Sequence, residues 1–343
     1  MNKIICADVI EGLRQLPRNS VNMCVTSPPY YGLRDYGTAT WTGGDSECNH
    51  YRHGKTENSN TGHQTMTSGV GDSIYRYVCG KCGAVRVEDK QIGLEDSPTL
   101  YVRKMVEVFR EVKRVLKDDG TLWLNIGDGY AGGSKGGGEG YLQSTNVGSL
   151  NVPKVGMAGC KQKDLYGVPW ALAFALRADG WYLRQDIIWH KKNPMPEPVK
   201  DRFTKSHEYL FLLSKNPDYY FNTDAVKEKA VYPNDDRGAR TDSRRGTGYN
   251  HMSGKTGEYR NKRDVWSIST RPYKGAHFAT FPPDLIRPCI LAGSRHGDLV
   301  LDPFMGSGTT AVVALEEGRQ YVGVELNPEY VKLAEDRIAG VVV

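Results

Sequence analysis

The stretch LVLDPFMGSGTTAVVALEEGRQYVGVELNPEY, residues 299–330, decides the fold. An apolar run, Leu299–Asp302, leads into a glycine-containing turn, and an apolar helical pattern, Thr309–Glu317, follows the turn. A second apolar run, Tyr321–Glu325, ends in an acidic residue twenty-three positions after Asp302. This succession of strand, glycine turn, helix and acidic strand end is typical of a nucleotide-binding crossover in a parallel sheet.

The same stretch narrows the class of ligand. Glycines at 306 and 308 let the backbone approach a ligand, and Glu325 can accept hydrogen bonds from ribose hydroxyls. No lysine follows the last glycine, so the turn is not a phosphate-binding P-loop, and the three-glycine dinucleotide spacing is absent. We therefore expect an adenosyl ligand without a phosphate cradle. The alternative is an ordinary tight strand-to-helix turn, which the distal acid disfavours.

The remainder of the chain alternates between strand and helix patterns. Further apolar runs predict buried strands at Ile4–Ala7, Val21–Thr26, Thr121–Ile126, Gln185–Trp189 and Tyr209–Leu213. Helical patterns lie at Leu100–Leu116, Pro169–Ala178, Pro283–Ala292 and Pro328–Ala339. This alternation predicts an α/β fold with a doubly wound, mostly parallel sheet covered by helices on both faces.

Composition excludes several classes of protein. The 343 residues are 39% hydrophobic and 25% charged, which suits a globular protein with a sizeable core. Neither a membrane-spanning apolar run nor a secretory signal is evident, so we expect a cytoplasmic protein. Seven unevenly placed cysteines argue against a disulfide scaffold, and a net charge of +5 permits a polyanionic partner.

A second motif, VTSPPYYG at residues 25–32, follows one of the predicted strands. Prolines fix φ and lack an N–H group, so the turn can present the Ser27 hydroxyl and the Pro28 carbonyl as acceptors in a rigid geometry. The ring of Tyr30 can stack on a planar base. The alternative is a proline turn that closes a strand, with its tyrosines packed on the surface.

Together, DPFMGSGTT and TSPPY resemble the DNA amino-methyltransferases that use S-adenosylmethionine. The catalytic motif comes first and the cofactor motif last, an order similar to that of the beta group of this family. The resemblance implies a circularly permuted Rossmann-like sheet in which Tyr321–Glu325 neighbours Ile4–Ala7. It also implies that ADVIEGLRQLP contributes Asp8 to the adenine site and that HFATFPPDLI closes over the methionine end of the cofactor.

The resemblance assigns site residues position by position. The expected catalytic residues are Ser27, Pro28, Pro29 and Tyr30. The expected cofactor-binding residues are Asp8, Thr26, His277, Phe281, Asp302, Pro303, Phe304, Gly306, Ser307, Gly308, Thr309, Thr310, Glu325 and Asn327.

In the resembled family, serine at the first motif position usually accompanies N4 of cytosine, and Asp or Asn there accompanies N6 of adenine. Ser27 therefore favours site-specific methylation of a flipped cytosine, with adenine as the alternative. Methylation at C5 of cytosine would need a nucleophilic cysteine. The Pro288–Cys289 pair lies in an apolar helical pattern, where a buried structural thiol is the better interpretation.

Two cysteine-rich segments predict a structural zinc site. CGKCG at 79–83 can fold both thiolates onto one metal, and CNHYRH at 48–53 offers further ligands. The predicted ligands are Cys48, His50, Cys79 and Cys82, and His53 or His63 could replace His50. The alternative is a set of free thiols in a reducing cytosol.

The organisation follows from these motifs. We expect a catalytic domain formed by residues 1–36, 98–215 and 277–343, a zinc-binding insert at 37–97, and a DNA target-recognition region at 216–276. The last region holds twelve Lys/Arg and eight Asp/Glu, a mix that suits phosphate contacts but also suits a solvated loop.

Double-stranded DNA is the expected partner, and the resemblance to modification enzymes admits a cognate restriction endonuclease as another. Two rival functions remain at this stage. One is methylation of RNA or of a protein amide, and the other is a non-catalytic, zinc-containing DNA-binding protein that retains the fold. The intact pairing of TSPPY with DPFMGSGTT argues against the second. The sequence leaves the recognised site and the oligomeric state undetermined.

Overall fold

The computed structural model describes residues 2–32, 40–52, 73–75, 77–88, 90–131, 160–231, 257–270 and 281–341. The chain divides into two compact units. The larger unit comprises Met1–Pro28, Val108–Ile126 and Ala173–Val343, and the smaller unit comprises Pro29–Glu107 and Gly127–Leu172.

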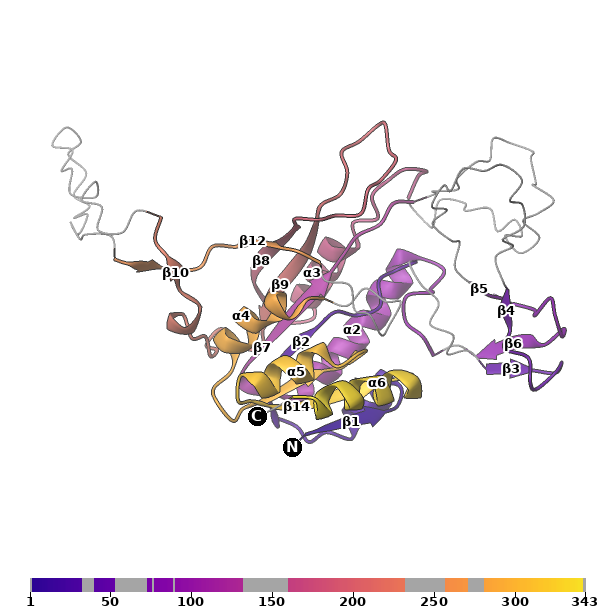
Figure 1. Ribbon diagram of the computed structural model, residues 1–343, viewed down its shortest axis with the longest axis horizontal. Helices are drawn as coiled ribbons and strands as arrows, with labels where there is room; N and C mark the ends of the chain where they lie inside the picture. Colours follow the sequence, from indigo (N-terminus) through magenta and orange to yellow (C-terminus); the bar gives the residue numbers. More distant parts are fainter. Residues whose placement is uncertain are drawn as a thin grey trace. The chain divides into compact units, whose positions relative to one another are not determined.

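An eight-stranded sheet forms the larger unit (Figure 1), in the order β1-β14-β13-β2-β7-β9-β8-β12. Its strands are β1 (Lys3–Cys6), β14 (Gln320–Glu325), β13 (Leu299–Asp302), β2 (Val21–Thr26), β7 (Leu116–Ile126), β9 (His207–Ser214), β8 (Tyr182–Lys191) and β12 (Val265–Ile268). Every neighbouring pair is parallel except the two pairs that include β9. The expectation of a mostly parallel sheet is therefore confirmed.

The first strand pairs with the last. Lys3 lies opposite Val322 in the β1–β14 ladder, as the sequence predicted for this pair of strands. The strands other than β9 point the same way, so their carboxyl ends gather at one edge of the sheet. Ligands of doubly wound sheets bind at this edge, which we call the carboxyl edge.

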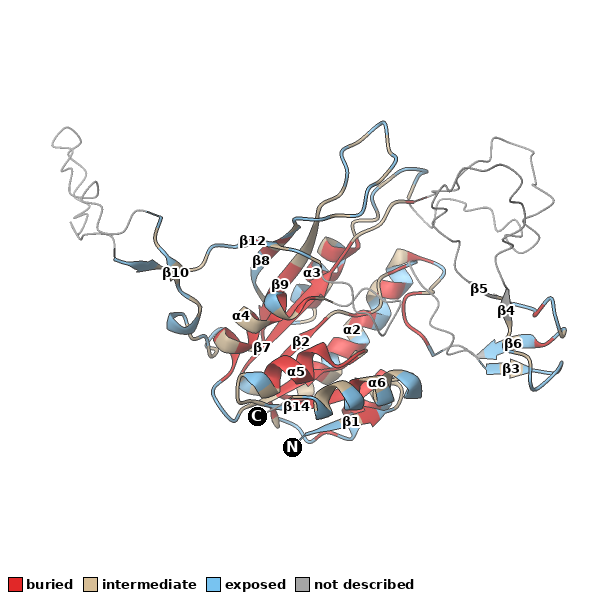
Figure 2. Ribbon diagram, viewed as in Figure 1, coloured by how far each residue is buried: buried red, intermediate tan, exposed pale blue. Residues whose placement is uncertain are grey.

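Helices flank the sheet: α1 (Val9–Arg14), α2 (Pro98–Val115), α3 (Val168–Ala178), α4 (Pro283–Gly293), α5 (Thr309–Glu316) and α6 (Pro328–Ala339), with a short 3₁₀ turn η1 (Asp224–Val226). Helices α4 and α5 pack over one face, where their apolar side chains meet Met23, Val25 and Trp123 in a single buried cluster. Figure 2 shows this burial along the central strands and the helices that cover them. No helix among the described residues is long and apolar enough to span a lipid bilayer.

Cys289 belongs to that buried cluster. It is fully buried in α4, and its thiol donates to the carbonyl oxygen of Leu285 at 3.5 Å. Burial raises the pKa of this thiol well above its ordinary value, because the thiolate would lose its hydration. The thiol is therefore structural, which excludes it as a C5-type nucleophile.

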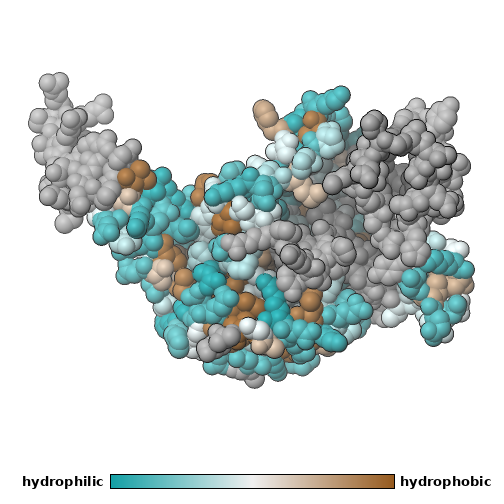
Figure 3. Space-filling view, in the orientation of Figure 1, coloured by the Kyte–Doolittle hydropathy of each residue, from teal (hydrophilic) through white to brown (hydrophobic). Residues whose placement is uncertain are grey.

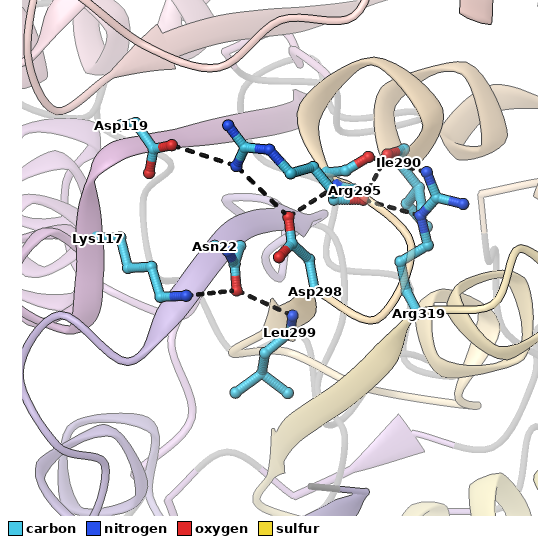
Figure 4. A network of polar contacts seen from close by, with 9 residues as sticks. Asn22, Lys117, Asp119, Ile290, Arg295, Asp298, Leu299 and Arg319 are labelled. Carbon is cyan, nitrogen blue, oxygen red and sulfur yellow. Dashed lines mark hydrogen bonds and ion pairs between the residues drawn. The ribbon is translucent and has the colours of Figure 1, made fainter.

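A polar network closes the opposite, amino-terminal edge of the sheet (Figure 4). The Asn22 side-chain oxygen accepts from Leu299 N at 3.1 Å and from Lys117 Nζ at 3.3 Å, joining the starts of three adjacent strands. Arg295 bonds both Asp298, through its backbone N at 2.7 Å, and Asp119, through its guanidinium at 3.4 Å. Charges at this edge are matched within the protein.

The small strands outside the main sheet form three antiparallel pairs: β3 (Thr40–Thr42) with β6 (Val85–Glu88), β4 (Tyr51–Arg52) with β5 (Ser73–Ile74), and β10 (Glu228–Lys229) with β11 (Tyr259–Arg260). The first two pairs belong to the smaller unit and the third to the larger. The proposed boundaries of the insert and of the recognition region stay predictions.

Sequence patterns misplaced some boundaries. The chain passes directly from α2 into β7 at Leu116, so β7 begins five residues before the strand predicted at Thr121. The six-residue helix α1 was not predicted, since one and a half turns are too short to show a helical period. The edge strand β12 was missed because four residues are too few to establish an alternating pattern in a polar stretch of the chain.

Gly293 gives a test of the packing of α4. A Cβ atom added there would lie 2.8 Å from Trp123 Nε1 and 3.1 Å from Thr121 Oγ1. We expect Gly293→Ala to lower the free energy of unfolding by about 1–3 kcal/mol, because the helix would be forced away from the sheet. Urea unfolding measures the change.

Gly340→Ala is the matched control, since the nearest atom to its added Cβ is 3.5 Å away and its φ is −81°. Its effect should stay within about 1 kcal/mol of wild type. Equal stabilities for the two variants would contradict the packing account.

Candidate cofactor and catalytic site

The carboxyl edge gathers the predicted cofactor residues of the larger unit. Thr26 ends β2, Asp302 ends β13 and Glu325 ends β14. These three strands are neighbours in the sheet, although β2 lies far from the other two in the sequence. Asp8 follows β1, which pairs with β14. Four side chains from distant parts of the sequence therefore share one edge.

Asp302 is the most constrained of them. Its side chain is buried and accepts from the Thr26 hydroxyl at 2.6 Å, the Thr310 hydroxyl at 2.6 Å and the Phe304 backbone N–H at 3.0 Å. Burial raises its pKa to about 6, because desolvation outweighs the three donors, which favour the charged form. The carboxyl thereby fixes the starts of two turns: the one after β2 and the one after β13.

The glycine turn needs its glycines. Gly306 and Gly308 have φ values of 51° and 80°, in the left-handed region that only glycine enters freely. A Cβ on Gly308 would also lie 2.9 Å from the Cβ of Ala334 in α6. The turn is consequently close-packed on one side by α6.

Arg337 of α6 is a site residue that the sequence did not reveal. Its guanidinium donates to Thr309 Oγ1 at 2.9 Å and to both the carbonyl and the hydroxyl oxygen of Ser307 at 3.2 Å. Ser307 and Thr309, two of the predicted cofactor-binding residues, are therefore held in place by a side chain of α6. No motif in the sequence signals this contact, because twenty-eight or more residues separate the partners.

Glu325 has the geometry of a ribose acceptor. Its two carboxylate oxygens accept from the backbone N–H groups of Gly306 at 2.8 Å and Asn327 at 2.9 Å. Each oxygen offers two lone pairs, so these bonds orient the carboxylate and leave acceptor capacity for two hydroxyls. Burial raises its pKa above the ordinary value. The side chain fits an adenosyl ligand.

The other predicted cofactor residues occupy varied positions. Asp8 caps α1, its carboxylate accepting from Ile10 N at 3.0 Å and Glu11 N at 3.3 Å. Pro303 is buried, and Phe281 packs against the core cluster beneath α4. His277 lies outside the described residues.

The Ser-Pro-Pro-Tyr turn begins where β2 ends. Ser27 and Pro28 directly follow Thr26, whose hydroxyl is bound to Asp302, so the first half of the turn leaves the sheet beside the cofactor turn. The division of the chain into two units falls after Pro28. Ser27 is half-buried and Pro28 is buried.

Within the smaller unit, Tyr101 anchors the second half of the turn. Its hydroxyl donates to the Pro29 carbonyl at 3.0 Å. Its ring also lies 5.7 Å from that of Tyr31, which meets Tyr166 edge-on at 5.3 Å. Tyr101, seventy-two residues from Pro29, is a further residue that no sequence pattern announced.

The smaller unit also brings together four metal-binding side chains. The ligand atoms of Cys48, His50, Cys79 and Cys82 all lie within 4.8 Å of one another. Backbone N–H groups of Ala84 and Asp45 donate to the Cys82 sulfur and lower the pKa of this thiol, which favours the thiolate. These residues fit a tetrahedral metal site of the Cys₃His type.

The surroundings support that arrangement. The Trp41 ring stacks on His50 at 4.3 Å and orients the imidazole. Gly44 has a φ of 71°, and a Cβ there would lie 2.8 Å from the Cys82 sulfur. A larger residue at 44 would displace a ligand.

A doubly wound sheet whose carboxyl edge holds a glycine turn, an oriented carboxylate and the start of a Ser-Pro-Pro-Tyr turn is the arrangement expected of an amino-methylating methyltransferase. The family described as DNA methylase, which covers N6- and N4-type enzymes, matches residues 21–336. The chain belongs to this family, and it is a DNA amino-methyltransferase.

Similar proteins support this family assignment. The type II methyltransferase M.Cfr9I of Citrobacter freundii is 44% identical over 97% of this chain and 86% of its own length. M.SmaI of Serratia marcescens, also a type II methyltransferase, is 42% identical over 98% of this chain and 90% of its own length. The solved PvuII DNA methyltransferase (cytosine-N4-specific) shares the fold, with a TM-score of 0.58 and 18% identity over 98% of this chain and 86% of that one.

The pKa of Asp302 yields a test. Because its pKa in the folded protein, about 6, exceeds the ordinary value of 3.8, the folded state binds the proton more tightly than the unfolded state. This contribution to stability is complete below about pH 4 and is lost as the pH rises through 6. Asp302→Asn removes the titration, so the stability of wild type relative to the variant should fall by about 2–3 kcal/mol across this window.

Chemical denaturation at a series of pH values measures the difference. Cofactor is left out, so that binding does not contribute. Parallel pH profiles for the two proteins would show that Asp302 titrates normally and would contradict the account.

Proposed function

We propose that the chain transfers a methyl group from S-adenosylmethionine to the exocyclic N4 of cytosine at a specific site in double-stranded DNA. The observation that carries the proposal is the 2.6 Å hydrogen bond from Thr26 to Asp302. It joins the residue before Ser27 to the residue that opens the glycine turn, so the acceptor groups for the target amine and the cofactor turn start from one buried contact.

The chemistry follows from the turn. The lone pair of an exocyclic amine is delocalised into the ring, and acceptors aimed at its two N–H bonds favour a more tetrahedral, nucleophilic nitrogen. The Ser27 hydroxyl oxygen and the Pro28 carbonyl serve as these acceptors, and the Tyr30 ring stacks on the extruded base. Direct transfer would form the nitrogen–methyl bond as the sulfur–methyl bond of S-adenosylmethionine breaks, leaving S-adenosylhomocysteine and releasing one amine proton to water. No covalent enzyme intermediate is needed, and positioning by the turn supplies much of the rate.

The cofactor site is assigned on the same basis. S-Adenosylmethionine supplies the electrophilic methyl group when bound. Glu325 would accept from its ribose hydroxyls, Asp8 would lie at its adenine, and the turn from Phe304 to Gly308 would approach its methionine portion. The hydrogen bonds that orient Glu325 support this assignment.

Serine at position 27 supports cytosine over adenine, since Asp or Asn would be expected there for N6 of adenine. Adenine stays the alternative target. The relatives named as type II methyltransferases support a role in restriction–modification with a cognate endonuclease as partner. A cytoplasmic location and a recognition role for residues 216–276 stay predictions.

We also propose that Cys48, His50, Cys79 and Cys82 hold one structural zinc ion. The distances among the ligand atoms, including 3.8 Å between the Cys48 and Cys79 sulfurs and 3.7 Å between Cys82 Sγ and His50 Nδ1, support it. The β3–β6 pair is mostly exposed, with Val85 and Val87 among the exposed apolar side chains, so a metal ion is a suitable source of stability for this segment.

The first test identifies the product. Methylated DNA is digested to nucleosides and analysed by mass spectrometry, and N4-methylcytosine is expected. N6-methyladenine in its place would overturn the cytosine assignment, but the proposed role of the turn in methylating an amino group would still stand.

Ser27→Ala tests the pocket itself. We expect turnover to fall on the order of 10²–10³-fold with nearly unchanged affinity for S-adenosylmethionine, because one preorganised acceptor is lost. Ser20→Ala, which removes a hydroxyl before the start of β2, should keep wild-type turnover. Full activity in Ser27→Ala would remove Ser27 from the mechanism.

The zinc site has its own test. Elemental analysis of protein purified without chelators should give about one zinc per chain. Cys79→Ser should lose the metal, whereas Cys160→Ser, which changes a cysteine outside the cluster, should keep it. Metal-free wild-type protein would refute the site.

A further inference from the structure

The loop between β8 and β9, residues 192–206, lies at the carboxyl edge (Figure 1). β9 runs antiparallel to both β7 and β8, so β8 points the same way as β7 and β2. Its last residue, Lys191, therefore ends at the same edge as Thr26 and Asp302. The loop starts from the edge at which the methyl-transfer residues lie.

Phe203 of this loop is almost completely exposed. Its exposed fraction is 97%, the highest among the large hydrophobic side chains of the described residues, and that of Met195 in the same loop is 85%. The ring buries almost none of its apolar surface within the protein, so that surface is available to an aromatic partner.

The loop is held by its own polar contacts. The Arg202 guanidinium bonds the Glu197 carboxylate at 2.5 Å and the Phe203 carbonyl oxygen at 3.2 Å. At the base of the loop, Asn193 exchanges two hydrogen bonds with Thr270, at 2.8 and 3.1 Å. Beyond Phe203, the backbone N–H of Lys205 donates to Glu197 at 3.5 Å, so polar contacts hold the backbone on both sides of the exposed ring.

Charge identifies the surface that would cover the ring. Residues 191–206 hold five basic and two acidic side chains. Arg202 is paired with Glu197 of the same loop, and Lys191 is paired with Glu208 of β9. Lys192 and Lys200 are exposed. Figure 3 shows apolar and strongly hydrophilic residues side by side on the surface. An exposed ring among cations suits a polyanion with stacked aromatic planes, which is duplex DNA.

We propose that Phe203 inserts into the DNA duplex at the target base and stabilises the extruded state by stacking where the base has left. Extruding a base loses its pairing and stacking, and an apolar wedge restores part of the stacking. The flanking cations bind the adjacent phosphates. The proposal rests on methylation of duplex DNA and holds for either target base.

The test compares methylation of two duplexes. Sequencing of plasmid DNA that the wild-type protein has methylated first identifies the site. One oligonucleotide duplex then carries this site with the target base paired, and a second carries it mispaired, so that extrusion is easier. Phe203→Ala and Phe203→Trp are compared with wild type. Tyr182→Ala is the control, since Tyr182 is an exposed aromatic residue at the opposite end of β8.

We expect Phe203→Ala to lower kcat/KM on the paired duplex by about 10–100-fold. On the mispaired duplex, kcat/KM of the variant should lie within about threefold of the wild-type value. Affinity for S-adenosylmethionine should not change. Phe203→Trp should retain activity on both duplexes, and its fluorescence should be quenched by paired DNA. Tyr182→Ala should match wild type.

Three results would overturn the proposal. The first is wild-type kcat/KM for Phe203→Ala on paired DNA. The second is an equal fall on both duplexes, which indicates a role other than extrusion. The third is loss of a dimer in Phe203→Ala on size exclusion, which would assign the ring to a second copy of the chain. Failure of wild-type protein to methylate any DNA would instead contradict the function itself.

Discussion

The buried hydrogen bond between Thr26 and Asp302 is the contact on which the site depends. It joins the ends of β2 and β13, which are adjacent in the sheet but 276 residues apart in the chain. Asp302 also binds Thr310 and the Phe304 amide, so one carboxyl fixes the start of the Ser-Pro-Pro-Tyr turn, the glycine turn and helix α5. Burial makes this carboxyl costly to ionise, and its three donors offset part of that cost.

The two edges of the sheet differ in how their polar side chains are paired. At the amino-terminal edge, Asn22, Arg295 and their partners satisfy one another and tie β2, β7 and β13 together. At the carboxyl edge, oriented acceptors such as Glu325 retain capacity for a ligand. The arrangement follows from the parallel direction of the strands, which places loops that bind ligands at one end.

The smaller unit depends on a different kind of stabilisation. Its β3–β6 pair leaves most of its side chains exposed, and its cysteine–histidine cluster is oriented by a ring stack and by a glycine that leaves room for a sulfur. Metal binding would join segments that have no core of their own. Tyr101, in the same unit, donates to the Pro29 carbonyl, so this unit holds the second half of the Ser-Pro-Pro-Tyr turn.

Local patterns in the sequence predicted the motifs, most strands of the main sheet and most of the helices, because apolar periodicity, glycine turns and cysteine spacing are local properties of the chain. The pairing of β1 with β14 and the clustering of Cys48, His50, Cys79 and Cys82 were also predicted from it. Other features became visible only in the tertiary structure: the antiparallel direction of β9, the hydrogen bonds from Arg337 to the glycine turn, and the exposure of Phe203. These depend on which distant segments pack together and which side chains are left uncovered, and no local pattern in the sequence records that outcome.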